Sequence, residues 1–181
     1  MEIEKIFVFL RGINVNGIKI KMDSLKDAFI KMDFDDVKTV LATGNVIFSL
    51  RTLIESIDLK KHIEAELSTA FNYEAHVIIR SFEELQEIIE ESKSIELPKS
   101  NNLYVLICES EEARTEIEGL FNKVEHTSEE SIKPLKKDLF WSVSKGQTLS
   151  SKFGAKVLGS KGFKDKFTSR NISTIERVFK C

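Results

Sequence analysis

The sequence predicts an α+β protein made of two ferredoxin-like βαββαβ(α) halves, each with an antiparallel sheet, packed as one compact unit. Short apolar runs alternate with amphipathic stretches of helical period along the 181 residues. In the first half their order is β-α-β-β-α-β followed by a helix, which is the order of the split βαβ fold. The second half repeats this order. A composition of 41% hydrophobic and 31% charged residues is that of an ordinary globular protein.

The first half starts with the clearest strand of the chain. Residues 6–10 read Ile-Phe-Val-Phe-Leu, a continuous apolar run that is typical of a central strand covered on both faces. Later in this half, residues 42–45 (Ala-Thr-Gly-Asn) have the composition of a hairpin turn. The other elements predicted here are helices at 22–32 and 59–71, and strands at 36–41, 46–48 and 75–80.

Capping residues mark the starts of two predicted helices. Asp23 and Ser24 are both suitable N-caps for the first helix. Ser81 and Glu84 have the spacing of a capping box, in which each side chain accepts a hydrogen bond from the backbone N–H of the other residue. We therefore expect a helix directly after the strand at 75–80.

The second half contains the same kinds of element with weaker boundaries. Residues 97–100 (Leu-Pro-Lys-Ser) separate the halves, so we expect domains at residues 1–97 and 98–181. Strands are predicted at 103–108, near 123–127 and at 139–143, and an extended segment is predicted near 163–168. Helices are predicted over 113–121, from near 150 to 158, and over 172–179.

Charge is distributed unevenly along the chain. Residues 1–132 carry 15 Lys/Arg and 26 Asp/Glu, a balance of −11, whereas residues 133–181 carry 12 and three, a balance of +9. The basic segment can attract anions, including nucleic acid, or it can pack against the acidic part and neutralise it. For nucleic-acid binding, the lysines expected on phosphates are Lys136, Lys137, Lys161, Lys164 and Lys166.

The sequence contains no pattern that predicts a membrane-spanning segment, a metal site or a cofactor site. No apolar run approaches the roughly 18 residues that span a bilayer, and the start of the chain is acidic where a signal peptide is basic. Cys108 lies in an apolar run and Cys181 ends the chain, so neither a disulfide framework nor a zinc site is predicted. We therefore expect a cytoplasmic protein with no membrane partner, no metal and no bound cofactor.

Strand order places distant polar segments at one edge of the first sheet. A ferredoxin-like sheet has the spatial order 4-1-3-2, so its first strand lies between the fourth and third strands and is antiparallel to both. The end of the first strand, Arg11-Gly12, is therefore expected beside the start of the third strand, Gly44-Asn45. The start of the fourth strand, near His76, belongs to the same edge.

This edge carries residue types that bind small anions. Arg11 offers a planar fork of donors for a carboxylate or a phosphate, and the nearby glycines let backbone N–H groups approach a ligand closely. In the second half, Lys152 lies at a predicted helix start, and Arg170-Asn171 opens the last helix. The predicted ligand-binding residues are Arg11, Gly12, Asn14, Gly17, Thr43, Gly44, Asn45, Lys152, Arg170 and Asn171.

Each of these segments also has a purely structural interpretation. A buried arginine at a strand end can hold loop carbonyls, and Gly-Asn turns are common because the turn geometry needs them. Asn171 is a good N-cap for the last helix, and Arg170 beside it can be a surface cation. The sequence leaves both interpretations open.

Several motifs give the chain a resemblance to a known bacterial family. They are Leu10-Arg11-Gly12-Ile13-Asn14-Val15-x-Gly17, Met22-x-x-Leu25, Phe34-x-x-Val37-x-Thr39, Thr43-Gly44-Asn45-Val46-x-Phe48, Ser151-Lys152 and Thr168-x-Arg170-Asn171-x-x-Thr174. In these motifs the chain resembles the domain of unknown function 1697 family. It departs from the family pattern at Asn16, Thr43 and Ile172, where glycine, serine and tryptophan are usual. The resemblance implies the duplicated ferredoxin-like fold and implies little about function, because the family's activity is unassigned.

The sequence supports several hypotheses about function. The first is binding of a small anionic ligand or a nucleotide phosphate at the Arg11/Asn45 edge. The second is nucleic-acid binding through residues 133–181. The third is an enzyme of unassigned chemistry at the same edge, with His76 as the candidate for a general base. An interaction module without a small ligand is the alternative to all three.

Overall fold

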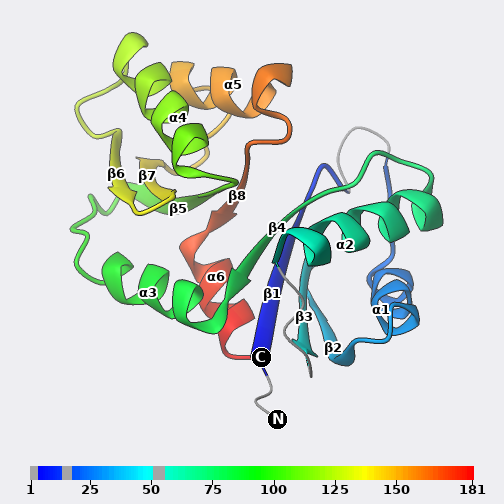
Figure 1. Ribbon diagram of the computed structural model, residues 1–181. Coiled ribbons are helices and arrows are strands. Elements are labelled where there is room, and N and C mark those ends of the chain that lie inside the picture. The colour runs from blue at the N-terminus through cyan, green and yellow to red at the C-terminus, as the bar shows by residue number, and fades with distance from the viewer. Residues whose placement is uncertain (1–3, 14–17, 51–55) are drawn as a thin grey trace. The chain divides into compact units, whose positions relative to one another are not determined.

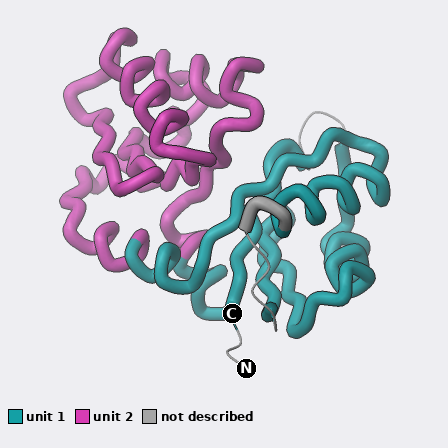
Figure 2. Tube along the Cα trace, in the orientation of Figure 1, with its two compact units in different colours: residues 1–87, 176–181 teal, residues 88–175 magenta. Residues whose placement is uncertain are grey.

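The computed structural model describes residues 4–13, 18–50 and 56–181 of the chain (Figure 1). These residues form two four-stranded antiparallel sheets with helices between the strands, which confirms the predicted α+β class. Contacts divide the chain into two compact units (Figure 2). Unit 1 comprises residues 1–87 and 176–181, and unit 2 comprises residues 88–175.

The first four strands form one antiparallel sheet. They are β1 (Glu4–Arg11), β2 (Asp35–Val40), β3 (Asn45–Leu50) and β4 (His76–Ser81), and the helices are α1 (Met22–Lys31), α2 (Ser56–Phe71) and α3 (Phe82–Ser92). The spatial order β2-β3-β1-β4 is the predicted order 4-1-3-2. Both neighbours of β1 are antiparallel to it. Helices α1 and α2 cover one face of this sheet (Figure 1).

The last four strands form a second sheet of the same design. They are β5 (Asn101–Cys108), β6 (Ser131–Leu135), β7 (Asp138–Ser144) and β8 (Phe167–Asn171). The helices are α4 (Glu111–Lys123), α5 (Lys152–Gly159), the short η1 (Lys161–Phe163) and α6 (Ile172–Phe179). The order β6-β7-β5-β8 matches that of the first sheet strand for strand. The predicted division between residues 97 and 98 falls in the connection from α3 to β5.

Strand β1 explains why the first apolar run of the sequence is continuous. Val8 belongs to the core that α1 and α2 cover. Phe7, which faces the other way, is also fully buried, and its ring stacks on Phe179 with the centroids 6.3 Å apart. Phe179 in turn stacks on Phe82, the first residue of α3, at 4.8 Å. The end of the chain therefore packs on the second face of the first sheet, which is why residues 176–181 belong to unit 1.

Helix α1 begins at the predicted residue 22, but of the two predicted caps one is wrong and one is confirmed. Helix α1 begins after Lys21, whose side chain makes no capping hydrogen bond, so neither Asp23 nor Ser24 is the N-cap. At the start of α3, the N–H of Ser81 donates to Glu84 Oε2 at 2.9 Å, and the N–H of Glu84 donates to Ser81 Oγ at 3.3 Å. This reciprocal pair is the predicted capping box.

The strand predicted near 123–127 is also wrong. Helix α4 extends through Lys123, and the strand lies later, at Ser131–Leu135. This strand, β6, is one of the two outer strands of its sheet, and none of its residues is buried. Pro134 interrupts its pattern, as is usual only for an edge strand. An exposed strand with a proline has no apolar alternation for sequence analysis to detect.

Candidate functional site

The structure confirms that the end of β1 lies beside the turn between β2 and β3. The pairing of β1 with β3 extends to Asn45, and the N–H of Leu10 donates to the carbonyl of Gly44 at 2.8 Å. On its other side, β1 pairs with β4, with Arg11 directly opposite His76. Three polar segments that are far apart in the sequence therefore meet at one edge of the first sheet.

The turn before β3 is held by buried contacts. Asn45 is fully buried, and its Nδ2 donates to the Val40 carbonyl at 2.7 Å and to Thr43 Oγ1 at 3.0 Å. Gly44 is also buried and has a φ of +76°, and a Cβ there would lie 2.5 Å from Ile13 Cδ1. Thr43 is exposed. Of these turn residues, Thr43 faces solvent, while the other two fix the conformation of the turn.

Arg11 and Gly12 form the accessible part of this edge next to β1. Arg11 is half-buried at the end of the strand. Gly12 is exposed and has a φ of +74°, and no described atom lies within 4 Å of the position of a Cβ there. Asn14 and Gly17 lie outside the described residues, so their predicted roles stay predictions.

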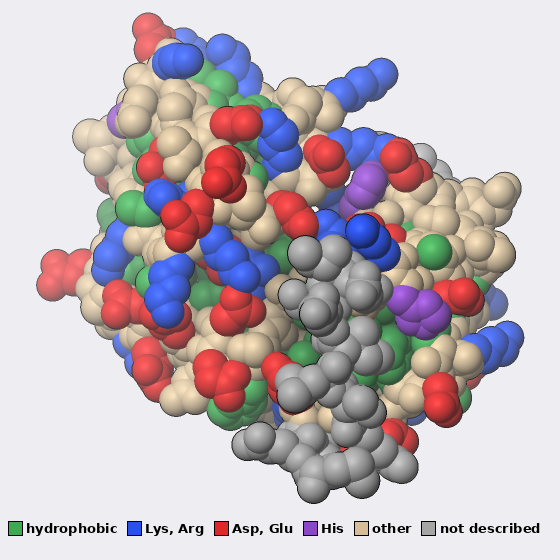
Figure 3. Space-filling model, in the orientation of Figure 1, with side chains coloured by type: hydrophobic (Ala, Val, Ile, Leu, Met, Phe, Trp, Pro, Cys, Tyr) green, Lys and Arg blue, Asp and Glu red, His purple; other side chains and the backbone are tan. Residues whose placement is uncertain are grey.

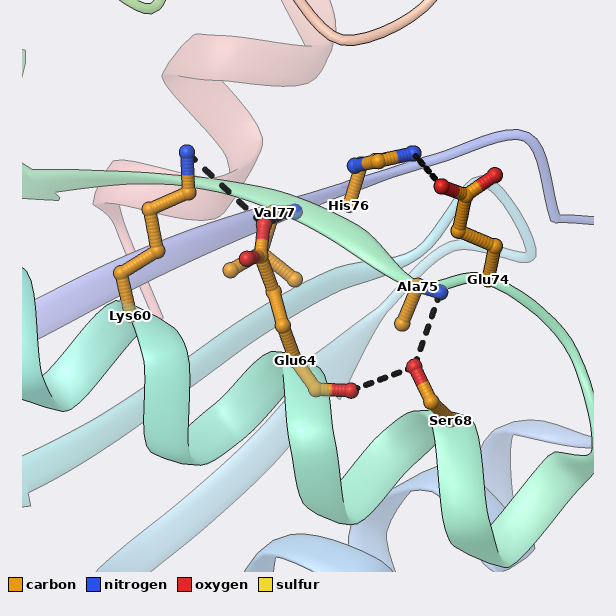
Figure 4. Close-up of polar contacts among 7 residues, drawn as sticks. All are labelled: Lys60, Glu64, Ser68, Glu74, Ala75, His76 and Val77. Carbon is orange, nitrogen blue, oxygen red and sulfur yellow. Dashed lines mark hydrogen bonds and ion pairs between the residues drawn. The ribbon is translucent and has the colours of Figure 1, made fainter.

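Helix α2 fixes the start of β4 through its polar side chains (Figure 4). The N–H of Val77 donates to Glu64 Oε1 at 3.0 Å, and the N–H of Ala75 donates to Ser68 Oγ at 3.0 Å. β4 is one of the two outer strands of its sheet. These side chains therefore accept hydrogen bonds from backbone N–H groups that have no neighbouring strand to pair with. His76 lies between the two anchored residues, and 25% of its side chain is exposed. Its position opposite the end of β1 is therefore well defined.

Arg170 and Asn171 make local contacts in unit 2. Asn171 Oδ1 accepts hydrogen bonds from the N–H of Ser173 at 2.9 Å and from its hydroxyl at 2.8 Å, which confirms the N-cap of α6. Arg170 is only 8% exposed, so the expectation of a surface cation is wrong. Its Nη1 donates to Thr168 Oγ1 at 2.7 Å and to the Ser169 carbonyl at 2.9 Å. Burial lowers the pKa of Arg170 to about 10.

Lys152 lies at the wall of a cavity within unit 2. It is the first residue of α5, and the N-cap Ser151 accepts a hydrogen bond from the N–H of Gly154 at 2.8 Å. The cavity has a volume of about 620 Å³. Lys152 is 65% exposed and forms an ion pair with Glu125. The hydrogen bond from Lys152 lowers the pKa of the Glu125 carboxyl. Lys152 is thus part of a concave site inside unit 2.

A family model described as "Protein of unknown function (DUF1697)" matches residues 3–140 of the chain. The chain belongs to this family. The matched part of this DUF1697 protein includes Arg11, Gly12 and the turn before β3, whereas Lys152, Arg170 and Asn171 lie beyond it. The description of DUF1697 assigns no activity to these residues.

The fold of this DUF1697 protein is shared with a solved structure. A conserved bacterial protein from Streptococcus pneumoniae matches it with a TM-score of 0.78 and 18% sequence identity. The match covers 99% of this chain and 98% of that chain. It shows that the two proteins have the same fold. No curated protein matches the chain.

Lysines of the basic segment pair with carboxylates from the acidic part of the chain. Lys133 Nζ lies 3.5 Å from Glu91 Oε2, and Lys166 forms an ion pair with Glu116. The ion pair of Lys152 is of the same kind. On the face shown in Figure 3, Lys and Arg side chains lie among Asp and Glu side chains. These contacts favour the neutralisation interpretation, and nucleic-acid binding stays a prediction.

Sequence analysis missed a buried arginine in unit 1. Arg80 is only 2% exposed, and its Nη1 donates to the carbonyl of the preceding residue, Ile79, at 2.8 Å. Arg170 makes the same contact with the residue that precedes it, at 2.9 Å. Each arginine is the next-to-last residue of the fourth strand of its sheet. The repeat therefore extends from element order to a side-chain contact. Aligning the two halves by element order would place Arg80 opposite Arg170 but would not show that either is buried.

The described part of the chain contains no cluster of metal ligands and no membrane-spanning helix. Within residues 4–13, 18–50 and 56–181, no group of three or more His, Cys, Asp or Glu side chains is arranged to hold a metal ion. None of the helices in those ranges is long and apolar enough to cross a bilayer. Cys108 is buried, as predicted, and neither it nor Cys181 is in a disulfide.

Proposed function

We propose that this DUF1697 protein binds a small ligand through an anionic group, such as a nucleotide phosphate, at the edge of the first sheet. The observation that supports the proposal is the direct pairing of Arg11 with His76 beside the turn before β3. Directly opposite residues of antiparallel strands have their side chains on the same face, with Cβ atoms about 5 Å apart. Two nitrogen-bearing side chains can therefore reach the same anion.

Each accessible residue of the edge has a role in the proposal. Arg11 donates two parallel N–H groups to oxygens of the anion, a bidentate, charge-assisted contact that suits a phosphate. His76, which lies 3.7 Å from a carboxylate oxygen of Glu74, donates one further N–H. Thr43 supplies a hydroxyl and Gly12 a backbone N–H. The two buried residues of the turn act by holding Thr43 in place.

The remaining predicted ligand-binding residues have a smaller part in the proposal or none. Asn14 and Gly17, which lie outside the described residues, are proposed to add an amide and a backbone donor. Lys152 lines a cavity of its own in unit 2. Arg170 and Asn171 already make local hydrogen bonds, so the proposal does not depend on them.

A titration of the Arg11→Ala variant tests this proposal. Isothermal titration calorimetry is carried out with inorganic phosphate, pyrophosphate and ATP on the wild type and the variant. We expect the wild type to bind at least one of these probes, and Arg11→Ala to bind it about tenfold more weakly or worse, because a charge-assisted pair contributes roughly 1.5–3 kcal/mol. Arg11→Lys keeps the charge but loses the fork, and is expected to bind with intermediate affinity.

The matched control is Arg177→Ala, which removes an exposed arginine from the last turn of α6. It is expected to bind like the wild type. Far-UV circular dichroism establishes that each variant is folded. Equal affinities of the wild type and Arg11→Ala, or no binding of any probe by the wild type, would reject the proposed function.

A further inference from the structure

The cavity in unit 2 is large enough for a metabolite. Its walls come from three separate segments of the chain, and no recognised binding motif marks them in the sequence. Its volume of about 620 Å³ lies within the range of roughly 300–1,000 Å³ that is usual for small-molecule sites. The segment after α4 forms one wall, and the end of β7 and the start of α5 form the others. It lies in unit 2, apart from the residues of the function proposed above, and shares none of them.

A buried carboxylate lines this cavity. Glu130 is only 6% exposed, and its Oε1 accepts a hydrogen bond from Trp141 Nε1 at 3.0 Å. Among the described residues, no partner contacts its second oxygen. A buried carboxylate is costly unless it is paired and fully hydrogen-bonded. The second oxygen is not among the buried unpartnered atoms of the described residues, so it is accessible from the cavity and can accept a hydrogen bond from a cationic nitrogen of a ligand.

The opposite charge is found at the start of α5. Lys152 is the first residue of this helix, and backbone N–H groups at a helix start favour an anion. The charged side chains of the cavity wall are those of Glu125, Glu130 and Lys152, so two carboxylates and one ammonium give a formal charge of −1. Lys152 and Glu125 form an ion pair with each other, so a ligand with one carboxylate and two cationic nitrogen groups would replace that pair with one contact to each of them and leave a cation for Glu130.

We propose that the unit 2 cavity binds an α-amino acid with a basic side chain, of the arginine or lysine class. A cationic nitrogen of the ligand donates to the second oxygen of Glu130, and the ligand carboxylate lies against Lys152 and the start of α5. His126, which also lines the cavity, is stacked on Phe121 with the ring centroids 4.2 Å apart and forms a flat wall beside the ligand.

The fluorescence of Trp141 can report binding at this cavity. Trp141 is the single tryptophan of the chain, is fully buried, and is hydrogen-bonded to Glu130. A cation placed on the Glu130 carboxylate changes the electrostatic environment of the indole. Binding is therefore read from the intrinsic fluorescence of the full-length protein during titration with L-arginine, with calorimetry as the second readout.

Two variants test separately which residue binds the cationic group of the ligand and which binds its carboxylate. Glu130→Gln keeps an acceptor for the Trp141 N–H but removes the negative charge, and is expected to weaken L-arginine binding about tenfold or more. Its control is Glu129→Gln, which neutralises an exposed neighbour that does not line the cavity, and which is expected to bind like the wild type. Lys152→Met is expected to weaken binding of L-arginine but not of agmatine, which lacks the carboxylate.

The probes also separate this proposal from its alternatives and from the proposed function. Glutarate, which has no cationic nitrogen, is expected not to bind. No saturable binding of L-arginine by the wild type, or equal binding by the wild type and Glu130→Gln, would overturn the proposal. If Glu130→Gln is unfolded by circular dichroism, unchanged L-arginine binding by Lys152→Met overturns it instead. Loss of phosphate binding in Arg11→Ala has no bearing on these outcomes, because the residues differ.

Discussion

Replacing Gly154 with alanine is expected to lower the free energy of unfolding by about 3 kcal/mol or more, the upper end of the range for overpacked sites. A Cβ at this position would lie 1.8 Å from the carbonyl oxygen of Thr148 and 2.9 Å from Ser151 Oγ. The first neighbour is a backbone atom, so it cannot rotate away, and the start of α5 has to move. Urea unfolding followed by circular dichroism and by Trp141 fluorescence measures the loss.

The control is Gly159→Ala at the other end of the same helix. A Cβ there would meet no described atom within 4 Å. Alanine is the better helix former, so this variant is expected to be unchanged or more stable by up to about 1 kcal/mol. A similar loss of stability in both variants would contradict the prediction, because it would show that the contact with Thr148 is not what makes Gly154 sensitive to substitution. Because Lys152 belongs to the same helix start, Gly154→Ala is also expected to weaken L-arginine binding.

The arrangement of the strands was predictable because it depends on local patterns and on general rules of topology. The run at residues 6–10 is apolar at every position because β1 is covered on both faces, with Val8 in one core and Phe7 under Phe179. Antiparallel pairing then places the end of β1 beside the starts of β3 and β4, so the proximity of Arg11 to the region of His76 follows from strand order. The direct pairing of these two residues depends on the register of the strands, which strand order does not give.

The burial of individual polar side chains was not predictable in the same way. Asn45 and Arg80 are almost completely buried, although nothing in their local sequence distinguishes them from surface residues of a strand end. Each donates to a backbone carbonyl, that of Val40 or of Ile79, whose availability depends on the folded chain. Polar groups of this kind are detected only after the hydrogen bonds of a segment have been accounted for.

The unit 2 cavity was hidden from sequence analysis for a related reason. Glu130 lies between a helix and a strand in a segment without apolar period, where a carboxylate is normally solvated. In the folded chain it is buried, and its carboxylate accepts a hydrogen bond from the indole of Trp141, which comes from strand β7. The sequence indicated Lys152 as a binding residue but contained no signal for the buried acid that lines the same cavity.

Replacing Gly44 with alanine is expected to lower the free energy of unfolding by about 3 kcal/mol, because the strain of a left-handed conformation and an overpacked contact add together. The Cβ would lie 2.5 Å from Ile13 Cδ1 and 2.9 Å from Leu10 Cβ. The end of Ile13 can rotate, but Leu10 Cβ is fixed to a backbone whose N–H already donates to the Gly44 carbonyl. Urea unfolding followed by circular dichroism gives the value.

Gly12→Ala separates the two contributions. Gly12 has nearly the same φ, +74° against +76°, but no described atom would contact its Cβ. Its variant is expected to lose only the roughly 1 kcal/mol of left-handed strain. Equal losses at the two positions would show that the packing of the turn against β1 contributes nothing. A larger loss at Gly44 would show that this glycine holds the turn, and with it Thr43, at the proposed anion site.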